Sequence, residues 1–260
     1  MPSTLRLDRL SSLLRAFAPR VVVAVSIHTP LTHLEQTLCV YLVLHQGDVL
    51  VCPGQPPKAI AAGSVVIAPA SLQSSVSTAI ALNVQLEGPA ATLLMGEFAQ
   101  PMILSIKGAD TALTLSVELL HSELSAPRCG QPALLSSAGN ILFIGLLRQL
   151  VARPQTSSGL FASLADPRIA ATLVAMNERP QDLWDLSALA ALAGMSRTAF
   201  ALRFKEVMAV SPGKYLARLR LLVAQAAVNS GKGLKGAARE SGYRNVSALS
   251  RALGRAKIAA

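Results

Sequence analysis

The stretch that decides the fold is residues 186–205, LSALAALAGMSRTAFALRFK. Its first half repeats apolar residues at helical spacing, at Leu186, Leu189, Ala190 and Ala193. Gly194 can adopt the left-handed conformation of a tight turn, and Ser196 suits the N-cap of whatever follows. The stretch therefore predicts two short helices joined by a turn.

The second of these helices has two different faces. Phe200 and Phe204 form an i,i+4 apolar pair that should face the first helix. At about 100° per residue the opposite face carries Thr198, Ala201, Leu202 and Lys205, with Arg197 and Arg203 toward its edges. An apolar back, a reading face and basic edges are what a helix in the DNA major groove needs. The same spacing also fits an ordinary solvated helical hairpin.

A second copy of the pattern follows the first. LKGAARESG at residues 234–242 parallels LSALAALAG at residues 186–194, and Leu249 and Leu253 stand where the two phenylalanines stood, after one extra residue in the turn. A long helix starting at Ser211 and Pro212 and running through Val228 joins the copies. The predicted DNA contacts of the second unit are Arg244, Ser247, Ser250 and Arg251. Such a repeat lowers the chance that the first match is accidental.

Positive charge is concentrated in the same part of the chain. Residues 166–260 hold 15 Lys and Arg against 6 Asp and Glu, a net charge of +9, whereas residues 1–165 carry a net charge of only +1. This asymmetry indicates that the C-terminal half meets a polyanion. Because no single helix is both basic and amphipathic, DNA is favoured over a membrane surface.

The N-terminal half has a different texture. A short helix is expected at residues 8–17, followed by seven apolar runs with polar turns between them, VVVAVSI, LCVYLVL, DVLVC, SVVIAP, AIALNVQL, TLLMGEF and PMILSI. They predict an antiparallel sandwich or barrel, although alanine-rich runs could also be buried helices. Two helices are expected at residues 110–124 and 131–153, the second packing on its own barrel and on a partner subunit. PQTSSG at residues 154–159 has linker composition, so the domains are placed at residues 1–160 and 161–260.

Compartment and membrane signals are weak. Cys39, Cys52 and Cys129 cannot all pair within one chain, which favours a reduced, cytoplasmic protein. The N-terminus does not resemble a secretory signal. The apolar region at residues 133–150 is interrupted by polar residues, so a buried or dimer-forming helix is favoured over a membrane span.

Four sequence motifs of the C-terminal segment, taken in order, resemble the DNA-binding domain of AraC/XylS-type transcription regulators. They are LADPRIAATL, LSALAALAGMSRTAFALRFKEV, SPGKYLARLRLLVAQ and ARESGYRNVSALSRAL, and they cover most of residues 164–255. Residues 5–155 resemble more weakly the cupin-like sensor domain of one branch, through DRLSSLLR, YLVLHQG and AAGSVVIAP. The resemblance implies an α+β two-domain fold: a cupin-like β-barrel with flanking helices, and an all-α domain with two helix-turn-helix units that enter successive major grooves.

This chain departs from the family pattern in both halves of the DNA-binding domain. Leu202 stands where the family often has an arginine or another polar residue, so the first unit is expected to read DNA by shape and methyl contact. Phosphates would be held by Arg197, Arg203 and Lys205, and Arg251 is the best candidate for direct base readout. Gly236 lowers the helix propensity of the second unit by about 1 kcal/mol. The chain also ends at Ala260, before the family's usual closing segment. We therefore expect less amide hydrogen-exchange protection in the second unit.

Two further sites can be sought in the sensor half. His28, His33, Glu35 and His45 are potential metal ligands, but they form no His-x-His pair, and Ser74 replaces the histidine typical of the branch, so no metal or cofactor is predicted. Cys39 and Cys52 flank an expected hairpin turning near residues 45–48 and would form a redox pair if they lay opposite each other. Two buried small hydrophobic residues are the favoured alternative.

The sequence thus predicts a cytoplasmic, homodimeric, sequence-specific transcription regulator. Its partners would be double-stranded DNA, a small-molecule or stress signal and, for an activator, RNA polymerase. No catalytic motif is present. The alternatives are a cupin-type metal-dependent enzyme with a basic helical tail and an adaptor that does not bind DNA.

Overall fold

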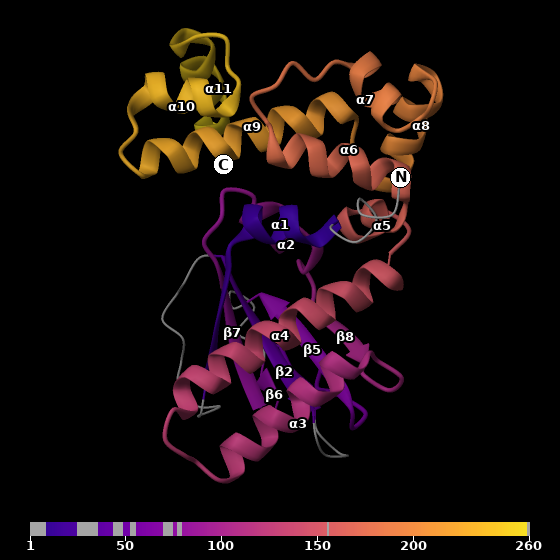
Figure 1. The fold of residues 1–260 in the computed structure, drawn as a ribbon, viewed down its shortest axis with the longest axis vertical. Coiled ribbons are helices and arrows are strands. Elements are labelled where there is room, and N and C mark those ends of the chain that lie inside the picture. Colours follow the sequence, from indigo (N-terminus) through magenta and orange to yellow (C-terminus); the bar gives the residue numbers. More distant parts are fainter. Residues whose placement is uncertain are drawn as a thin grey trace. The chain divides into compact units, whose positions relative to one another are not determined.

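The computed structural model describes residues 9–24, 36–43, 49–52, 56–69, 75–76, 80–154 and 156–258. The chain forms two compact units (Figure 1). The sheet unit comprises Ala18–Glu87 and Ala91–Gln149, and the helical unit comprises Met1–Phe17, Gly88–Ala90 and Leu150–Ala260. The predicted two-domain α+β class is confirmed. The boundary at residue 160 stays a prediction, and the compact units divide instead at residue 150 and assign the first helix to the helical unit.

Two antiparallel sheets form the sheet unit. In the larger sheet the strand order is β1 (Pro19–Ala24), β7 (Ile80–Leu86), β2 (Thr37–Val43), β5 (Ser64–Pro69) and β8 (Met102–Ser105). In the smaller sheet it is β4 (Lys58–Ala59), β3 (Val49–Val51) and β6 (Ser75–Val76). Six of the seven predicted runs each overlap one strand, namely β1, β2, β3, β5, β7 or β8. The two-residue strands β4 and β6 lie outside the predicted runs.

The prediction of a strand in TLLMGEF is wrong. Those residues fall on helix α2 (Ala91–Glu97) and the residue after it. Leu94 and Phe98 are both fully buried and stand four residues apart, the spacing of one helical face. Leu, Met, Ala and Glu are also good helix formers, and Thr92 is the only β-branched residue of the run.

Strand β2 is buried on both faces. Cys39, Tyr41 and Val43 belong to a cluster that also contains Leu50 and Cys52 from the smaller sheet and its edge. On the other face Val40 lies directly opposite Leu82 of β7, whose side chain packs on helix α4. This double burial explains why TLCVYLV is continuously apolar instead of alternating.

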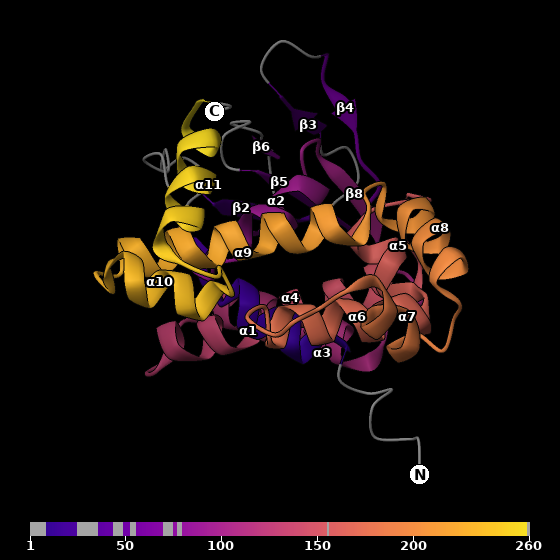
Figure 2. The same cartoon turned by 90° about the horizontal axis from the view of Figure 1, so that it is seen from above.

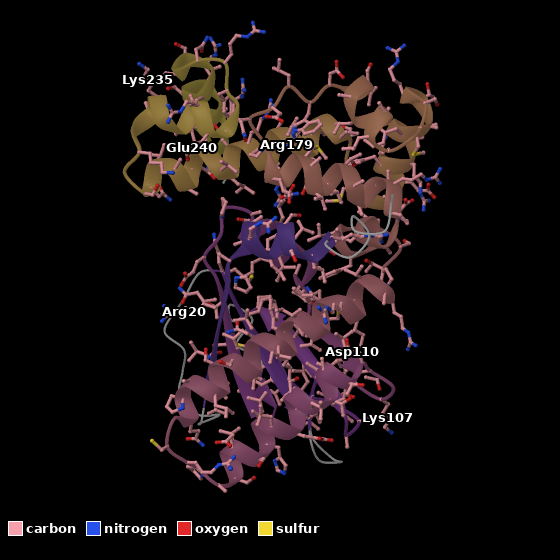
Figure 3. The ribbon with its side chains drawn as sticks, viewed as in Figure 1. Arg20, Lys107, Asp110, Arg179, Lys235 and Glu240 are labelled. Atoms are coloured by element: carbon pink, nitrogen blue, oxygen red, sulfur yellow. The ribbon has the colours of Figure 1, made fainter. Side chains whose placement is uncertain are left out.

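Helices α3 (Thr111–Ser125) and α4 (Gln131–Ala152) cover the larger sheet. A Cβ at Gly139 would lie only 2.6 Å from Val21 Cγ1 of β1, so this glycine allows α4 to approach the sheet. Ten residues later Gln149 Nε2 donates to the Ser105 carbonyl of β8 at 2.7 Å. Helix α4 therefore crosses the sheet from one edge strand to the other. Asp110, labelled in Figure 3, caps α3 by accepting from Leu113 N at 2.8 Å.

By length and composition α4 could also cross a membrane, because an 18-residue stretch of it has a mean hydropathy of 1.5. Half of that stretch is buried inside the fold. A core helix of a soluble protein passes the same test, so this is weak evidence for a membrane span. The contacts of Gly139 and Gln149 agree with the prediction of a packed helix.

The helical unit holds the remaining helices. They are α1 (Arg9–Phe17), α5 (Leu160–Ala165), α6 (Pro167–Glu178), α7 (Leu186–Leu192), α8 (Arg197–Met208), α9 (Pro212–Asn229), α10 (Gly233–Ser241) and α11 (Val246–Ile258). Figure 2 shows α9 running from the α7–α8 pair to the α10–α11 pair. The short helix α5 was not predicted. Helix α1 packs on α6, where Arg15 pairs with Glu178 at 2.8 Å. It also contacts α5, where Arg9 donates to the Leu164 carbonyl at 3.0 Å.

Candidate DNA interface

The first helix-turn-helix unit has the local structure that its sequence predicts. Asp185 caps α7 by accepting from Ala188 N at 2.7 Å, and Ser196 caps α8 by accepting from Ala199 N at 3.3 Å. Gly194 has a φ of 64°, in the left-handed region. The turn is thus fixed by two side-chain caps and one glycine.

The back of α8 is anchored by aromatic packing. Phe200 and Phe204 are fully buried, and their ring centroids lie 5.6 Å apart in an edge-to-face arrangement. Phe204 also packs against Tyr215 of α9, whose hydroxyl accepts from Asn177 Nδ2 of α6 at 2.8 Å. Burial raises the pKa of Tyr215 to about 12, so the hydroxyl stays neutral. The Phe204–Tyr215 ring contact and the Tyr215–Asn177 hydrogen bond therefore join helices α6, α8 and α9.

The front of α8 is open to solvent. Leu202 exposes 67% of its surface. Arg197, Thr198 and Lys205 are also exposed, and Ala201 is half-buried. The side chains predicted to face DNA thus point outward, and the contacts with DNA themselves stay a prediction.

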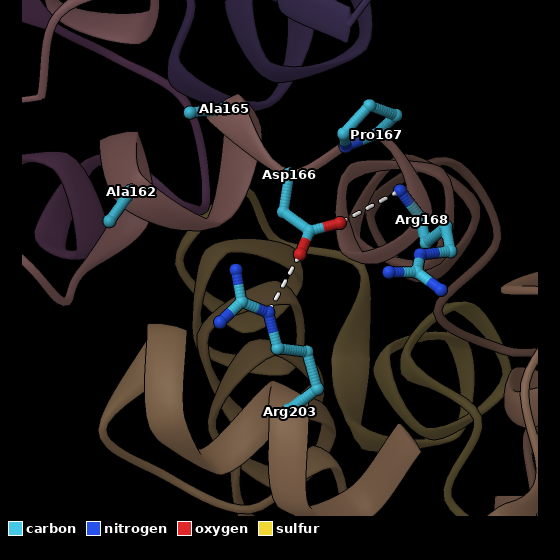
Figure 4. Close-up of a pocket in the computed structure, with 6 residues that line it drawn as sticks. All are labelled: Ala162, Ala165, Asp166, Pro167, Arg168 and Arg203. Atoms are coloured by element: carbon cyan, nitrogen blue, oxygen red, sulfur yellow. Dashed lines mark hydrogen bonds and ion pairs between the residues drawn. The ribbon is translucent and has the colours of Figure 1, made fainter. Parts of the chain in front are cut away.

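Arg203 makes contacts within the protein that its sequence position did not suggest. Its Nε donates to Asp166 Oδ2 at 2.8 Å, and its Nη1 donates to Glu206 Oε2 at 2.9 Å. Asp166 is the N-cap of α6, and its other oxygen accepts from the backbone nitrogens of Arg168 and Ile169. Figure 4 shows this pair in an open pocket of about 520 Å³, lined by Ala162, Ala165, Asp166, Pro167, Arg168 and Arg203.

The charge state of this pair follows from its surroundings. Burial alone would raise the pKa of Asp166, but the hydrogen bonds from Arg203 and from two backbone amides outweigh it and hold the pKa below its usual range. The bonds to Asp166 and Glu206 raise the pKa of the Arg203 guanidinium. Arg203 therefore ties α8 to the start of α6, and its predicted phosphate contact would compete with that role.

The second unit repeats the first with one change in the turn. Gly242 ends α10 with a φ of 74°, and α11 begins four residues later, compared with three residues from Gly194 to α8. This agrees with the extra residue that the sequence predicts. Asn245, which was not singled out in the sequence, caps α11 by accepting from Ala248 N at 2.8 Å.

The outward face of α11 is polar. Leu249 is fully buried, whereas Arg244, Ser247, Ser250 and Arg251 are all exposed. Among the described residues no ion pair is found for Arg197, Lys205, Arg244 or Arg251. Four cations on or beside α8 and α11 are therefore available to phosphates.

The predicted sites of the sensor half have mixed outcomes. His28, His33, Glu35, His45 and Ser74 lie outside the described residues. Within the described residues, no group of three or more His, Cys, Asp or Glu side chains could hold a metal ion.

The expected hairpin between the two cysteines is wrong. Strand β2, with Cys39, pairs with β5 and β7, while β3, next to Cys52, pairs with β4 and β6. Strand β2 thus pairs with strands much further along the chain, and β3 pairs with the next strand, β4, and with β6. Cys39 and Cys52 are both buried free thiols in one apolar cluster, as the favoured alternative predicts. Burial raises the pKa of Cys39, so its reactive thiolate is disfavoured.

Comparisons with known proteins agree with this geometry. A family model described as a helix-turn-helix domain matches residues 189–257, and one described as a cupin matches residues 40–152. The two matches follow the order that the sequence predicts, a cupin-like domain first and a helix-turn-helix domain after it.

Curated relatives carry similar descriptions. An uncharacterized HTH-type transcriptional regulator of Haemophilus influenzae is 31% identical over 123 residues, which are 47% of this chain and 41% of that protein. The RCS-specific HTH-type transcriptional activator RclR of Escherichia coli is 31% identical over 109 residues, 42% of this chain and 38% of RclR. A putative AraC-like transcription regulator of Streptomyces antibioticus is 35% identical over 112 residues, 42% of this chain and 37% of that protein. The matches thus span about two fifths of each relative.

Among solved structures, ToxT from Vibrio cholerae aligns over 91% of this chain and 92% of its own, with 9% identity and a TM-score of 0.38.

Proposed function

We propose that this protein is a sequence-specific, DNA-binding transcription regulator whose two helix-turn-helix units both contact DNA. The single observation that carries the proposal is the pair of units with buried apolar backs and exposed, partly basic faces, joined by one helix in the basic half of the chain. The relatives are named as transcription regulators, which favours this function over the cupin-type enzyme and the adaptor.

Base readout and phosphate binding are divided between the two units. Arg251 can make a bidentate contact with a guanine, whereas Thr198, Ala201 and Leu202 can meet thymine methyl groups and local shape. Ser247 and Ser250 can bond to bases or phosphates. Arg197, Lys205 and Arg244 supply phosphate contacts.

The sheet unit is the proposed sensor. A pocket of about 130 Å³ opens beside the apolar cluster and is lined by Leu50, Cys52, Pro56, Lys58, Gln100, Pro101 and Ile103. Sites for drug-sized ligands measure about 300–1,000 Å³, so this pocket fits a small effector or one end of a larger one. A stress signal is the alternative input to this unit.

A homodimer is part of the proposal. Leu115 and Leu119 stand four residues apart on α3 and are 56% and 36% exposed, and Ile141 of α4 is 48% exposed. Exposed large apolar residues on two neighbouring helices favour contact with a second copy. In solution, the Leu115→Glu/Ile141→Glu variant should have half the molecular mass of the wild type by light scattering. A cytoplasmic location and, for an activator, contact with RNA polymerase complete the proposed function.

The decisive experiment measures DNA affinity at several salt concentrations. The probe is a duplex that the full chain selects from fragments of its own genome, followed by fluorescence anisotropy. Each phosphate contact contributes about 0.9 to the slope of log K against log salt, so the double variant Arg197→Ala/Lys205→Ala should lower the slope by about two. Lys107→Ala, labelled in Figure 3, removes one exposed charge from the sheet unit and should leave the slope unchanged. A wild-type affinity that does not depend on salt would refute DNA binding through this interface.

A further inference from the structure

The loop between α6 and α7, residues 179–185, is braced by its own side chains. Trp184 Nε1 donates to the Arg179 carbonyl at 2.8 Å, and the Arg179 guanidinium lies 5.4 Å from the centroid of the Trp184 ring. Arg179, labelled in Figure 3, also pairs with Asp182 at 3.4 Å. This loop leads directly into the first helix-turn-helix unit.

Helix α9 holds the loop through one side chain. Arg220 Nε donates to the Pro180 carbonyl at 2.7 Å, and Arg220 Nη2 donates to the Asp182 carbonyl, also at 2.7 Å. Both bonds are partly buried. The planar guanidinium bridges two carbonyls two residues apart, which a lysine ammonium cannot do in the same fixed geometry.

The second unit touches the same loop. A Cβ at Gly242, the turn glycine between α10 and α11, would lie 2.7 Å from Gln181 Cα and 3.0 Å from the carbonyl oxygens of Pro180 and Gln181. The turn of the second unit is therefore in direct backbone contact with the loop that precedes the first unit. We call Arg220, Gly242 and residues 179–185 the junction.

The junction is a second connection between the two helix-turn-helix units. The first is α9, whose 18 residues span about 27 Å. A helix joined at both ends through short turns can hinge at those turns. A contact from the middle of α9 and another from the second turn, both onto one braced loop, oppose that hinge motion.

We propose that Arg220 and Gly242 are positioning residues that fix the separation and rotation of α8 and α11, and so select the spacing between the two DNA blocks that the protein accepts. The proposal rests on the proposed function, in which both helices contact DNA. One inserted base pair moves the second block by about 3.4 Å and rotates it by about 35°. A rigid pair of units cannot follow this change, whereas a hinged pair can.

The test compares spacing profiles. A duplex selected by the full chain from a random library is mapped by hydroxyl-radical footprinting to locate two protected blocks, and one or two base pairs are then inserted between them. Wild-type protein should lose about tenfold or more in affinity per inserted base pair, the loss expected when one block's contacts are disrupted. Arg220→Ala and Gly242→Ala should bind the original duplex more weakly but lose less than about threefold per insertion.

Controls keep the outcome unambiguous. Arg218→Ala removes an equal charge from an exposed position of α9 and should keep the wild-type profile. If Arg220→Ala does not fold by circular dichroism, Arg220→Lys takes its place, because it retains the charge and the side-chain stem. Two protected blocks with an unchanged spacing profile in the junction variants would overturn this inference alone. A single protected block for the wild type would overturn the proposed two-unit interface as well.

Discussion

Replacing Asp166 and Arg203, singly and together, tests how the first recognition helix is held. In the structure the pair is partly buried, since the Asp166 side chain is 9% exposed and the Arg203 side chain is 39% exposed. A charge-assisted hydrogen bond contributes about 1.5–3 kcal/mol, and the exposure of Arg203 reduces this to about 1–2 kcal/mol. Arg203→Ala should therefore lower the free energy of unfolding by about 1–2 kcal/mol.

Asp166→Ala should cost more, because it also removes the N-cap of α6. A lost cap adds about 1 kcal/mol, which gives a total of about 2–3 kcal/mol. The double variant should resemble Asp166→Ala, with a coupling of about 1–2 kcal/mol between the two positions. Urea denaturation of the four proteins measures these values. Additive single effects would refute the idea that the two side chains act as a pair.

The pH dependence supplies an independent check. The pKa of Asp166 is lower in the folded protein than in the unfolded chain, so the pair stabilises the fold above the ordinary aspartate value of about 3.9. That contribution is lost as the pH falls through the lowered pKa. The gap in stability between wild type and Asp166→Asn should thus shrink on acidification below about pH 4.

The salt slope of DNA binding should not change in Arg203→Ala, and a decrease of about 0.9 would assign Arg203 to a phosphate instead.

Three further predictions concern other parts of the molecule. Arg251→Ala should change the preferred DNA sequence in a selection experiment, and an unchanged preference would assign readout to shape alone. Gly139→Leu should lower the thermal midpoint of the protein, because its Cβ would already lie 2.6 Å from Val21 Cγ1. Gly108→Ala is the comparison variant: that glycine has open space around it, but its φ is 72°. Mild oxidant should give no Cys39–Cys52 crosslink by mass spectrometry, since Cys39 lies opposite Ala68 and Asn83 and burial raises its thiol pKa. A crosslink at native stability would revive the redox hypothesis.

Local signals in the sequence predicted the DNA-binding half well. Gly194, Ser196 and the Phe200–Phe204 pair each act within a few residues of themselves, so the turn, the cap and the buried face follow from spacing. The bond between Arg203 and Asp166 spans 37 residues, and no local pattern distinguishes an arginine that binds a carboxylate from one that binds a phosphate.

Predictions for the sheet unit succeeded for most strands and failed for their pairing. Apolar runs mark strands because burial on one or two faces is a local requirement, but pairing depends on contacts far apart in sequence. Cys39 and Cys52 illustrate this, since Cys39 lies on β2 of the larger sheet and Cys52 directly follows β3 of the smaller sheet. The helix α2 shows the other limit, because a short apolar run fits a buried helix as well as a strand.

The extra residue in the second turn has a consequence for protein engineering. Counted from the buried pairs Phe200–Phe204 and Leu249–Leu253, Thr198 matches Ser247, Ala201 matches Ser250, and Leu202 matches Arg251. Counted from the turn glycines, each match moves by one position, which is a rotation of about 100° around the helix axis. A chimera that transplants a DNA-reading face between the two units should thus be registered on the apolar pair, since registration on the glycine would place the residue from position 201 at the buried Leu249.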